Sequence, residues 1–151
     1  MAGKYFDQFE IGQTFAHEVR RTVTDMDNIL FSTLTHNPAA IHIDHEYAKT
    51  TEFGRPLMNS IFTLGLVVGL SVQDTTLGTT VGNLGWEGVA FPKPVFSGDT
   101  IRAETTVVAL RGSKSRPEQG IVTFEHRGYN QQGDVVCTCR RVALMMRKPQ
   151  Q

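Results

Sequence analysis

The sequence has little of what would mark a nucleic-acid-binding or membrane-bound protein. Lys and Arg together number 15, as do Asp and Glu, so the formal net charge is zero. Because nucleic acids and anionic membranes attract basic surfaces, this balance favours neither as the main partner. The local basic clusters are only pairs, which we interpret as solvated strand ends: Arg20-Arg21, Arg140-Arg141 and Arg147-Lys148.

Cysteine is scarce, and no apolar run is as long as a membrane span. Cys137 and Cys139 lie two residues apart on an expected strand. Both side chains then point to the same face of that strand and are badly placed to form a disulfide with each other. No second Cys or His pair lies near them, so we expect free thiols and no metal. The stretch Met1–Asp7 lacks an apolar core of the signal-peptide type, and Ile61–Val72 is too short to cross a bilayer. We therefore expect a cytoplasmic protein.

The length of 151 residues fits one domain, residues 1–151, able to bury roughly 70% of its unfolded surface. Ile61–Val72 indicates a long buried helix, capped by Asn59 or Ser60 and ending near Gln73. Gly65 and Gly69 lie four apart on one face of it, which we interpret as a close approach to a sheet.

Shorter elements surround this helix. Thr24 with Asp27 predicts a capped helix over residues 25–34, and Asp44 caps another over residues 45–51. Strand patterns cover residues 14–23, 79–89, 100–110, 121–129 and 134–146. The order favours an α+β protein in which a curved antiparallel sheet wraps around one central helix, the hot-dog fold.

A polar cluster, Thr35–Asp44, and a loop, Phe53–Ser60, lead directly into the long helix. The N-terminus of a helix presents unpaired N–H groups that favour negative charge. A site that binds a carbonyl oxygen and moves a proton needs both titratable groups and such donors. This stretch is therefore the candidate site.

Three motifs follow one another along the chain: Thr35-x-Asn37-x-x-x-x-His42-x-Asp44, Phe53-Gly54-Arg55-Pro56-Leu57 and Phe91-Pro92-x-Pro94-Val95-x-x-Gly98-Asp99-Thr100. Together they resemble the MaoC-like hydratase/dehydratase family of hot-dog proteins. The resemblance runs from Phe6 to about Arg147. The last motif is common to the family and indicates the fold more than the chemistry.

The resemblance implies an enzyme that adds water to, or removes it from, the α,β double bond of an acyl-CoA thioester. Coenzyme A is then part of the substrate, and no cofactor is expected. Family members hold an Asp and a His over that bond; His42 matches the His, but Asn37 stands at the Asp position and Ser60 replaces a Gly. Because an amide takes no proton at neutral pH, His42 is expected to do the acid/base work and Asn37 to orient water.

Asn37 together with the run Leu57–Ser60 resembles the subgroup acting on branched C5 dicarboxylic acyl-CoAs, namely mesaconyl-CoA, β-methylmalyl-CoA, and itaconyl-CoA or citramalyl-CoA. Such a substrate carries a distal carboxylate, and Arg55 is a candidate to bind it. The equal alternative is that Arg55 is an ordinary exposed turn residue. The resemblance also implies that N–H groups near Gly54 and Asn59–Ser60 bind the thioester carbonyl.

The other charged and titratable groups have simpler interpretations. Lys114 and Arg116 are candidates for contact with CoA phosphates, although an ordinary charged loop is favoured. Asp44 is favoured as a helix cap rather than a substitute base. The remaining histidines are expected to be surface, capping or structural groups: His17, His36, His45 and His126.

Two other functions remain open. A hot-dog thioesterase would hydrolyse the thioester, but its usual acidic base is missing between Gly54 and Gln73. A non-catalytic acyl-CoA-binding protein would have kept the fold and lost the Asp. By the same resemblance we expect at least a homodimer, because hot-dog proteins place the site at a dimer interface.

Overall fold

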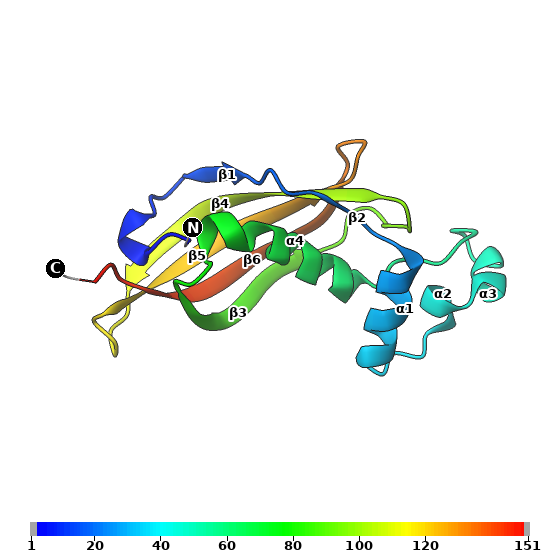
Figure 1. Cartoon of the computed structure of the whole chain (residues 1–151), viewed down its shortest axis with the longest axis horizontal. Coiled ribbons are helices and arrows are strands. Elements are labelled where there is room, and N and C mark those ends of the chain that lie inside the picture. Colours follow the sequence, from blue (N-terminus) through cyan, green and yellow to red (C-terminus); the bar gives the residue numbers. More distant parts are fainter. Residues whose placement is uncertain (1–2, 150–151) are drawn as a thin grey trace.

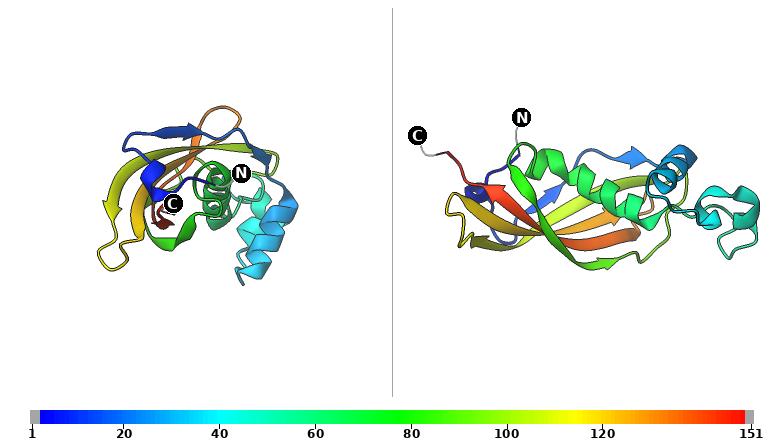
Figure 2. Two further views of the ribbon diagram at one scale, coloured as in Figure 1. Left: turned by 60° about the vertical axis from the view of Figure 1, so that its left-hand side comes forward. Right: turned by 90° about the horizontal axis from the view of Figure 1, so that it is seen from below.

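The computed structural model describes residues 3–149 and confirms a single curved antiparallel sheet (Figures 1 and 2). The strand order is β1-β4-β5-β6-β3, and β2 also pairs with β4. The strands are β1 (Thr14–Ala16), β2 (Arg21–Thr22), β3 (Thr80–Ala90), β4 (Thr100–Gly112), β5 (Gln119–Tyr129) and β6 (Val135–Met146).

The sheet curves around α4 (Ser60–Thr75), the long apolar helix (Figure 1). Residues of β4 alternate between buried and half-buried over most of its length, as a strand with one face on the core requires. The close approach to the sheet is made at Gly128, where an added Cβ would lie 2.3 Å from the Val67 side chain. Apart from the neighbouring backbone of α4 itself, no described atom lies within 4 Å of a Cβ built at Gly65 or Gly69. The expectation that these two glycines bring the helix to the sheet is therefore wrong, because they lie on its open side.

Three helices lie beyond the end of the sheet at which α4 begins (Figure 1): α1 (Asp25–Leu34), α2 (Ala40–Ile43) and α3 (His45–Lys49). The predicted caps are confirmed, since Thr24 and Asp27 form a capping box and Asp44 accepts a bond from the Tyr47 N–H at 3.0 Å. The sequence does not predict α2 because four residues are too few to show a helical period. No helix within residues 3–149 is long and apolar enough to cross a membrane.

One predicted strand, over residues 14–23, is broken in the structure. Ala16 pairs with Glu104, and Arg21 pairs with Ile101. The four residues between Ala16 and Arg21 therefore lie opposite only two residues of β4. The surplus interrupts the ladder and separates β1 from β2. His17 occupies this break, and its side chain turns into the interior.

Candidate functional site

His42 lies on α2 and is half-buried. Its Nδ1 lies 2.7 Å from the carbonyl oxygen of Leu57. Because a carbonyl oxygen only accepts hydrogen bonds, Nδ1 carries the proton and Nε2 of the neutral ring keeps its lone pair. Within residues 3–149 no hydrogen-bond partner occupies Nε2. The contact with Leu57 therefore leaves the Nε2 lone pair available to accept a proton.

Asn28 on α1 ties this region together, although the sequence patterns do not single it out. Its side-chain amide donates to the carbonyl oxygens of His42 at 2.8 Å and Leu57 at 3.0 Å, and its Oδ1 accepts from the Asn59 N–H at 2.9 Å. Asn28 is 2% exposed. One buried amide thus positions α2, the following loop and the start of α4. The available signal is Asn28 with Ser32, two polar residues on one face of the helix predicted over residues 25–34.

Substitution of Asn28 by alanine is expected to lower the free energy of unfolding by about 3 kcal/mol, because it leaves buried backbone groups without partners. Urea denaturation at fixed protein concentration measures this change. Thr33→Ala, at an exposed position on the same helix, is the matched control and should change stability by less than about 0.5 kcal/mol. Equal stability of the two variants would contradict the role given to Asn28.

Asn37 closes a local turn just before α2. Its Oδ1 accepts from the Ala39 N–H at 3.0 Å, and its own N–H donates to the Ser32 carbonyl at 2.8 Å. His36, with φ of 55°, makes the reversal that brings the chain out of α1. The amide oxygen of Asn37 is therefore engaged by backbone, which leaves its NH₂ group as the part able to orient a water molecule.

The backbone donors near the start of α4 are largely used within the protein. Asn59 caps α4 through its side chain, and its N–H donates to Asn28. The Gly54 N–H donates at 3.1 Å to a carbonyl in its own turn. In the described part of the chain the Ser60 N–H has no such partner. Of the expected donors to a thioester oxygen, Ser60 is the one left free.

An apolar cavity of about 220 Å³ lies beside the start of α4. Its walls include Phe53, Leu57, Met58, Phe91, Val95 and Val136. Ser60 also lines it, so the free N–H belongs to a residue of the cavity wall. Arg55 does not line the cavity; its guanidinium lies 3.9 Å from the centre of the Phe96 ring and stacks on it.

Lys114 and Arg116 lie in the loop between β4 and β5, at the opposite end of the sheet from α1, α2 and α3 (Figures 1 and 2). Arg116 contacts residues of that same loop, with its N–H donating to Ser113 at 3.2 Å. Within one chain the structure therefore does not bring these two cations beside His42.

The histidines expected at the surface and the two cysteines expected as free thiols are placed as predicted. His36 is exposed, and the exposed His45 lies 3.6 Å from Asp25 at the surface. Cys137 and Cys139 are buried free thiols, and burial raises their pKa to about 12 and about 11. Residues 3–149 contain no group of three or more His, Cys, Asp or Glu side chains that could hold a metal.

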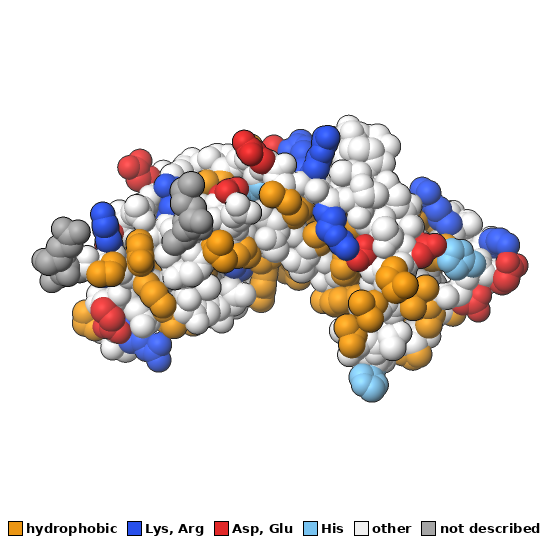
Figure 3. Space-filling view, viewed as in Figure 1, with side chains coloured by type: hydrophobic (Ala, Val, Ile, Leu, Met, Phe, Trp, Pro, Cys, Tyr) orange, Lys and Arg blue, Asp and Glu red, His pale blue; other side chains and the backbone are white. Residues whose placement is uncertain are grey.

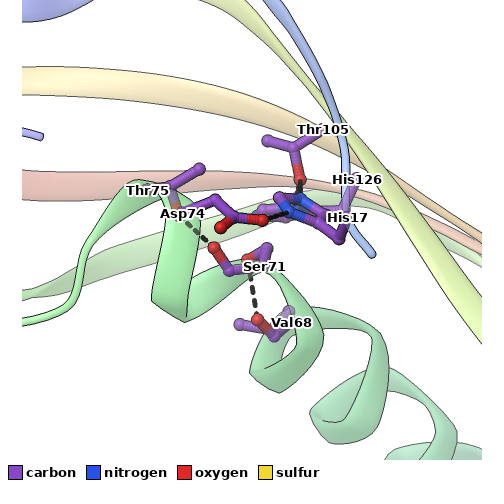
Figure 4. Close-up of polar contacts among 7 residues, drawn as sticks. All are labelled: His17, Val68, Ser71, Asp74, Thr75, Thr105 and His126. Atoms are coloured by element: carbon purple, nitrogen blue, oxygen red, sulfur yellow. Dashed lines mark hydrogen bonds and ion pairs between the residues drawn. The ribbon is translucent and has the colours of Figure 1, made fainter. Parts of the chain in front are cut away.

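A second polar cluster lies near the far end of α4 (Figure 4). His17 Nδ1 lies 2.7 Å from the Asp74 carboxylate, and its Nε2 lies 2.8 Å from the Thr105 hydroxyl. The same hydroxyl lies 2.8 Å from Nδ1 of His126, whose Nε2 accepts from Arg141 Nε at 3.1 Å. The cluster joins α4 to β4, β5 and β6.

Arg141 fixes the direction of the two bonds that His126 makes. Because a guanidinium N–H only donates, Nε2 of His126 accepts and its proton lies on Nδ1. His126 then donates to the Thr105 hydroxyl, and Nδ1 of His17 donates to the Asp74 carboxylate, which only accepts. Burial, reinforced by Arg141 and His17, lowers the pKa of His126 to about 3, which keeps this ring neutral.

Asp74, His17 and Thr105 have the order of an Asp-His-hydroxyl catalytic triad. The Thr105 hydroxyl cannot act as a nucleophile, because Thr105 is 0% exposed and the hydroxyl is bonded to both histidines. The expectation that His17 and His126 are structural is confirmed by their burial. The cluster fastens the end of α4 to the sheet.

Comparison with known families gives the context of the site. The family model described as "MaoC like domain" matches residues 7–130. The chain belongs to the MaoC-like family.

Two curated relatives and one solved structure resemble this MaoC-like chain. It is 34% identical over 147 residues to mesaconyl-CoA hydratase of Cereibacter sphaeroides. The matched region covers 97% of this chain and 42% of that relative. The chain is 33% identical over 115 residues to an (R)-specific enoyl-CoA hydratase of Aeromonas caviae, covering 76% of the chain and 81% of the enzyme. The monoamine oxidase regulatory protein from Archaeoglobus fulgius has a TM-score of 0.86 at 31% identity, covering 99% of this chain and 98% of that one. The MaoC-like chain thus spans less than half of the mesaconyl-CoA hydratase.

Proposed function

We propose that this MaoC-like chain adds water to, or removes it from, the α,β double bond of an enoyl-CoA thioester. The observation that carries the proposal is His42, whose Nδ1 is held by Leu57 and whose Nε2 has no partner among residues 3–149. Ser60, whose N–H has no partner in the described part of the chain, and Leu57, which holds His42, both line the apolar cavity. The likeness to an enoyl-CoA hydratase, most of whose length the chain covers, supports the same reaction.

In the hydration direction, Nε2 of His42 takes a proton from water as the water oxygen forms its bond to Cβ. The electron pair of the double bond moves through the thioester to its oxygen. The Ser60 N–H and the positive end of α4 stabilise this enolate. The enolate then takes the proton from His42 at Cα, which returns the ring to neutral. The NH₂ group of Asn37 orients the water, since it cannot accept the proton.

Within this reaction class, the proposed substrate carries a branched C5 dicarboxylic acyl group. The support is the resemblance to mesaconyl-CoA hydratase over nearly the whole chain. Arg55 makes no ion pair in the described part of the chain and stays a candidate for the distal carboxylate. Contact of Lys114 and Arg116 with CoA phosphates stays a prediction as well.

Incubation with straight-chain and C5 dicarboxylic enoyl-CoAs, read by mass spectrometry, tests the proposed reaction. Hydration adds the mass of one water while CoA remains attached. Release of free CoA thiol would instead identify a thioesterase. Thermal stabilisation by an acyl-CoA whose mass never changes would identify a non-catalytic binding protein. Either of these outcomes contradicts the proposal.

We also propose that two copies of this chain associate as a homodimer or a larger homo-oligomer. Helix α1 buries its polar side and exposes its apolar side, which gathers on the surface in Figure 3: Met26, Ile29, Leu30 and Leu34. The edge strand β3 has one unpaired side and carries exposed apolar residues, among them Leu84 and Trp86. Apolar patches and open edges are surfaces that a partner chain covers.

The native molar mass is therefore expected to be at least twice that of one chain. Light scattering after size-exclusion chromatography measures it. The double substitution Leu30→Glu and Leu34→Glu should shift the protein toward the monomer, because it buries charge in the interface. Ile11→Glu, at an equally exposed apolar residue outside α1 and β3, should leave the mass unchanged. A monomeric wild type would contradict the proposal.

A further inference from the structure

The cavity beside α4 has one charged residue in its described lining, Lys93. The neighbouring walls are apolar, with Phe53, Phe91 and Val136 among them. Leu57 lines the same cavity, and its carbonyl oxygen holds Nδ1 of His42. Lys93 therefore lines the same cavity as Leu57, which contacts His42, and Ser60, the first residue of α4.

The backbone at Lys93 is constrained by its neighbours. Pro92 and Pro94 each have a fixed φ, and Pro94 keeps Lys93 out of the helical region. The Met58 N–H donates to the Val95 carbonyl at 2.9 Å and anchors the segment beside α4. No acidic side chain pairs with Lys93 within residues 3–149. Its charge is thus free for a ligand.

We propose that Lys93 binds the distal carboxylate of a dicarboxylic acyl group and sets the preference for such substrates over monocarboxylic ones. The inference rests on the proposed enoyl-CoA hydratase function. Lys93 is exposed, but the apolar walls on one side of it keep water from part of the surroundings of a carboxylate bound there, which strengthens the attraction. Arg55 is less well placed, because it lies outside the lining and stacks on Phe96.

The test compares kcat/KM for mesaconyl-CoA and for the monocarboxylic crotonyl-CoA. Lys93→Met removes the charge but keeps most of the apolar stem. It should lower kcat/KM for mesaconyl-CoA by about 10- to 100-fold and change the value for crotonyl-CoA by less than about twofold. Lys93→Arg keeps the charge and should retain most of the preference. Lys148→Met, in the C-terminal segment beside Asp7, is the matched control and should change neither value.

An equal loss with both substrates would overturn the inference, since it would place Lys93 at a CoA phosphate, which both substrates share. Unchanged turnover of mesaconyl-CoA by Lys93→Met would overturn it too, as would a selective loss in Arg55→Met alone. Failure of the proposed function is distinguishable, because the wild type would then hydrate neither compound. In that case the inference is tested by binding alone. Lys93→Met should weaken the binding of mesaconyl-CoA but not that of crotonyl-CoA, as measured by calorimetry.

Discussion

Substitution of His42 by asparagine is expected to lower kcat/KM for the enoyl-CoA by about 10²- to 10⁴-fold while the fold stays intact. The asparagine NH₂ group can donate to the Leu57 carbonyl in place of the His42 Nδ1–H, which lies 2.7 Å from that oxygen. It offers no lone pair that takes a proton at neutral pH. The variant therefore separates the positioning of the loop from the proton transfer. His42→Ala removes both and should lose about 1 kcal/mol of stability in addition.

Initial hydration rates and urea denaturation, measured on the same preparations, check this expectation. His45→Asn is the matched control, because His45 lies close in sequence but is exposed. It should keep both rate and stability. An active His42→Asn would show that another group moves the proton, and Asn37, which has no proton-accepting nitrogen, could not be that group.

The parts of the fold that depend on local chemistry are predictable from the sequence. The capping box at Thr24 and the cap at Asp44 each involve side chains within three residues of the backbone they bind. The long helix is predictable because Ile61–Val72 is the most apolar run in the chain. Alternation along β4 predicts its face on the core. In each case the interaction and the pattern that reveals it lie in the same short segment.

The parts that depend on distant contacts are not predictable in this way. Asn28 positions the site by binding Leu57 and Asn59, which lie 29 and 31 residues away. A short polar side chain on a helix carries no mark of which distant backbone groups it will meet. The break between β1 and β2 likewise arises from pairing with β4, far along the chain. The amphipathic pattern of α1 predicts the helix but misleads about its burial, because its apolar side is the exposed one.

The largest expected effect of pH on stability comes from His126. An unfolded chain protonates a histidine as the pH falls below about 6.5, whereas burial keeps folded His126 neutral until about pH 3. The unfolded state thus binds more protons in this window, so the free energy of unfolding falls as the pH falls. The slope approaches about 1.4 kcal/mol per pH unit, so about 2 to 3 kcal/mol should be lost between pH 6.5 and 4.5. Urea denaturation at several pH values and one protein concentration measures the loss.

His126→Gln shows whether this one ring is responsible. Glutamine does not titrate, so the slope should decrease by about one proton, although the variant is less stable at pH 7 because the bonds to Thr105 and Arg141 change. His36→Gln, at an exposed histidine, should keep the wild-type slope. A wild-type slope as flat as that of His126→Gln would contradict the assignment.

Nitrogen chemical shifts of His126 at pH 5 test the direction of its hydrogen bonds. A proton on Nδ1 and none on Nε2 is the only arrangement compatible with the Arg141 guanidinium as donor.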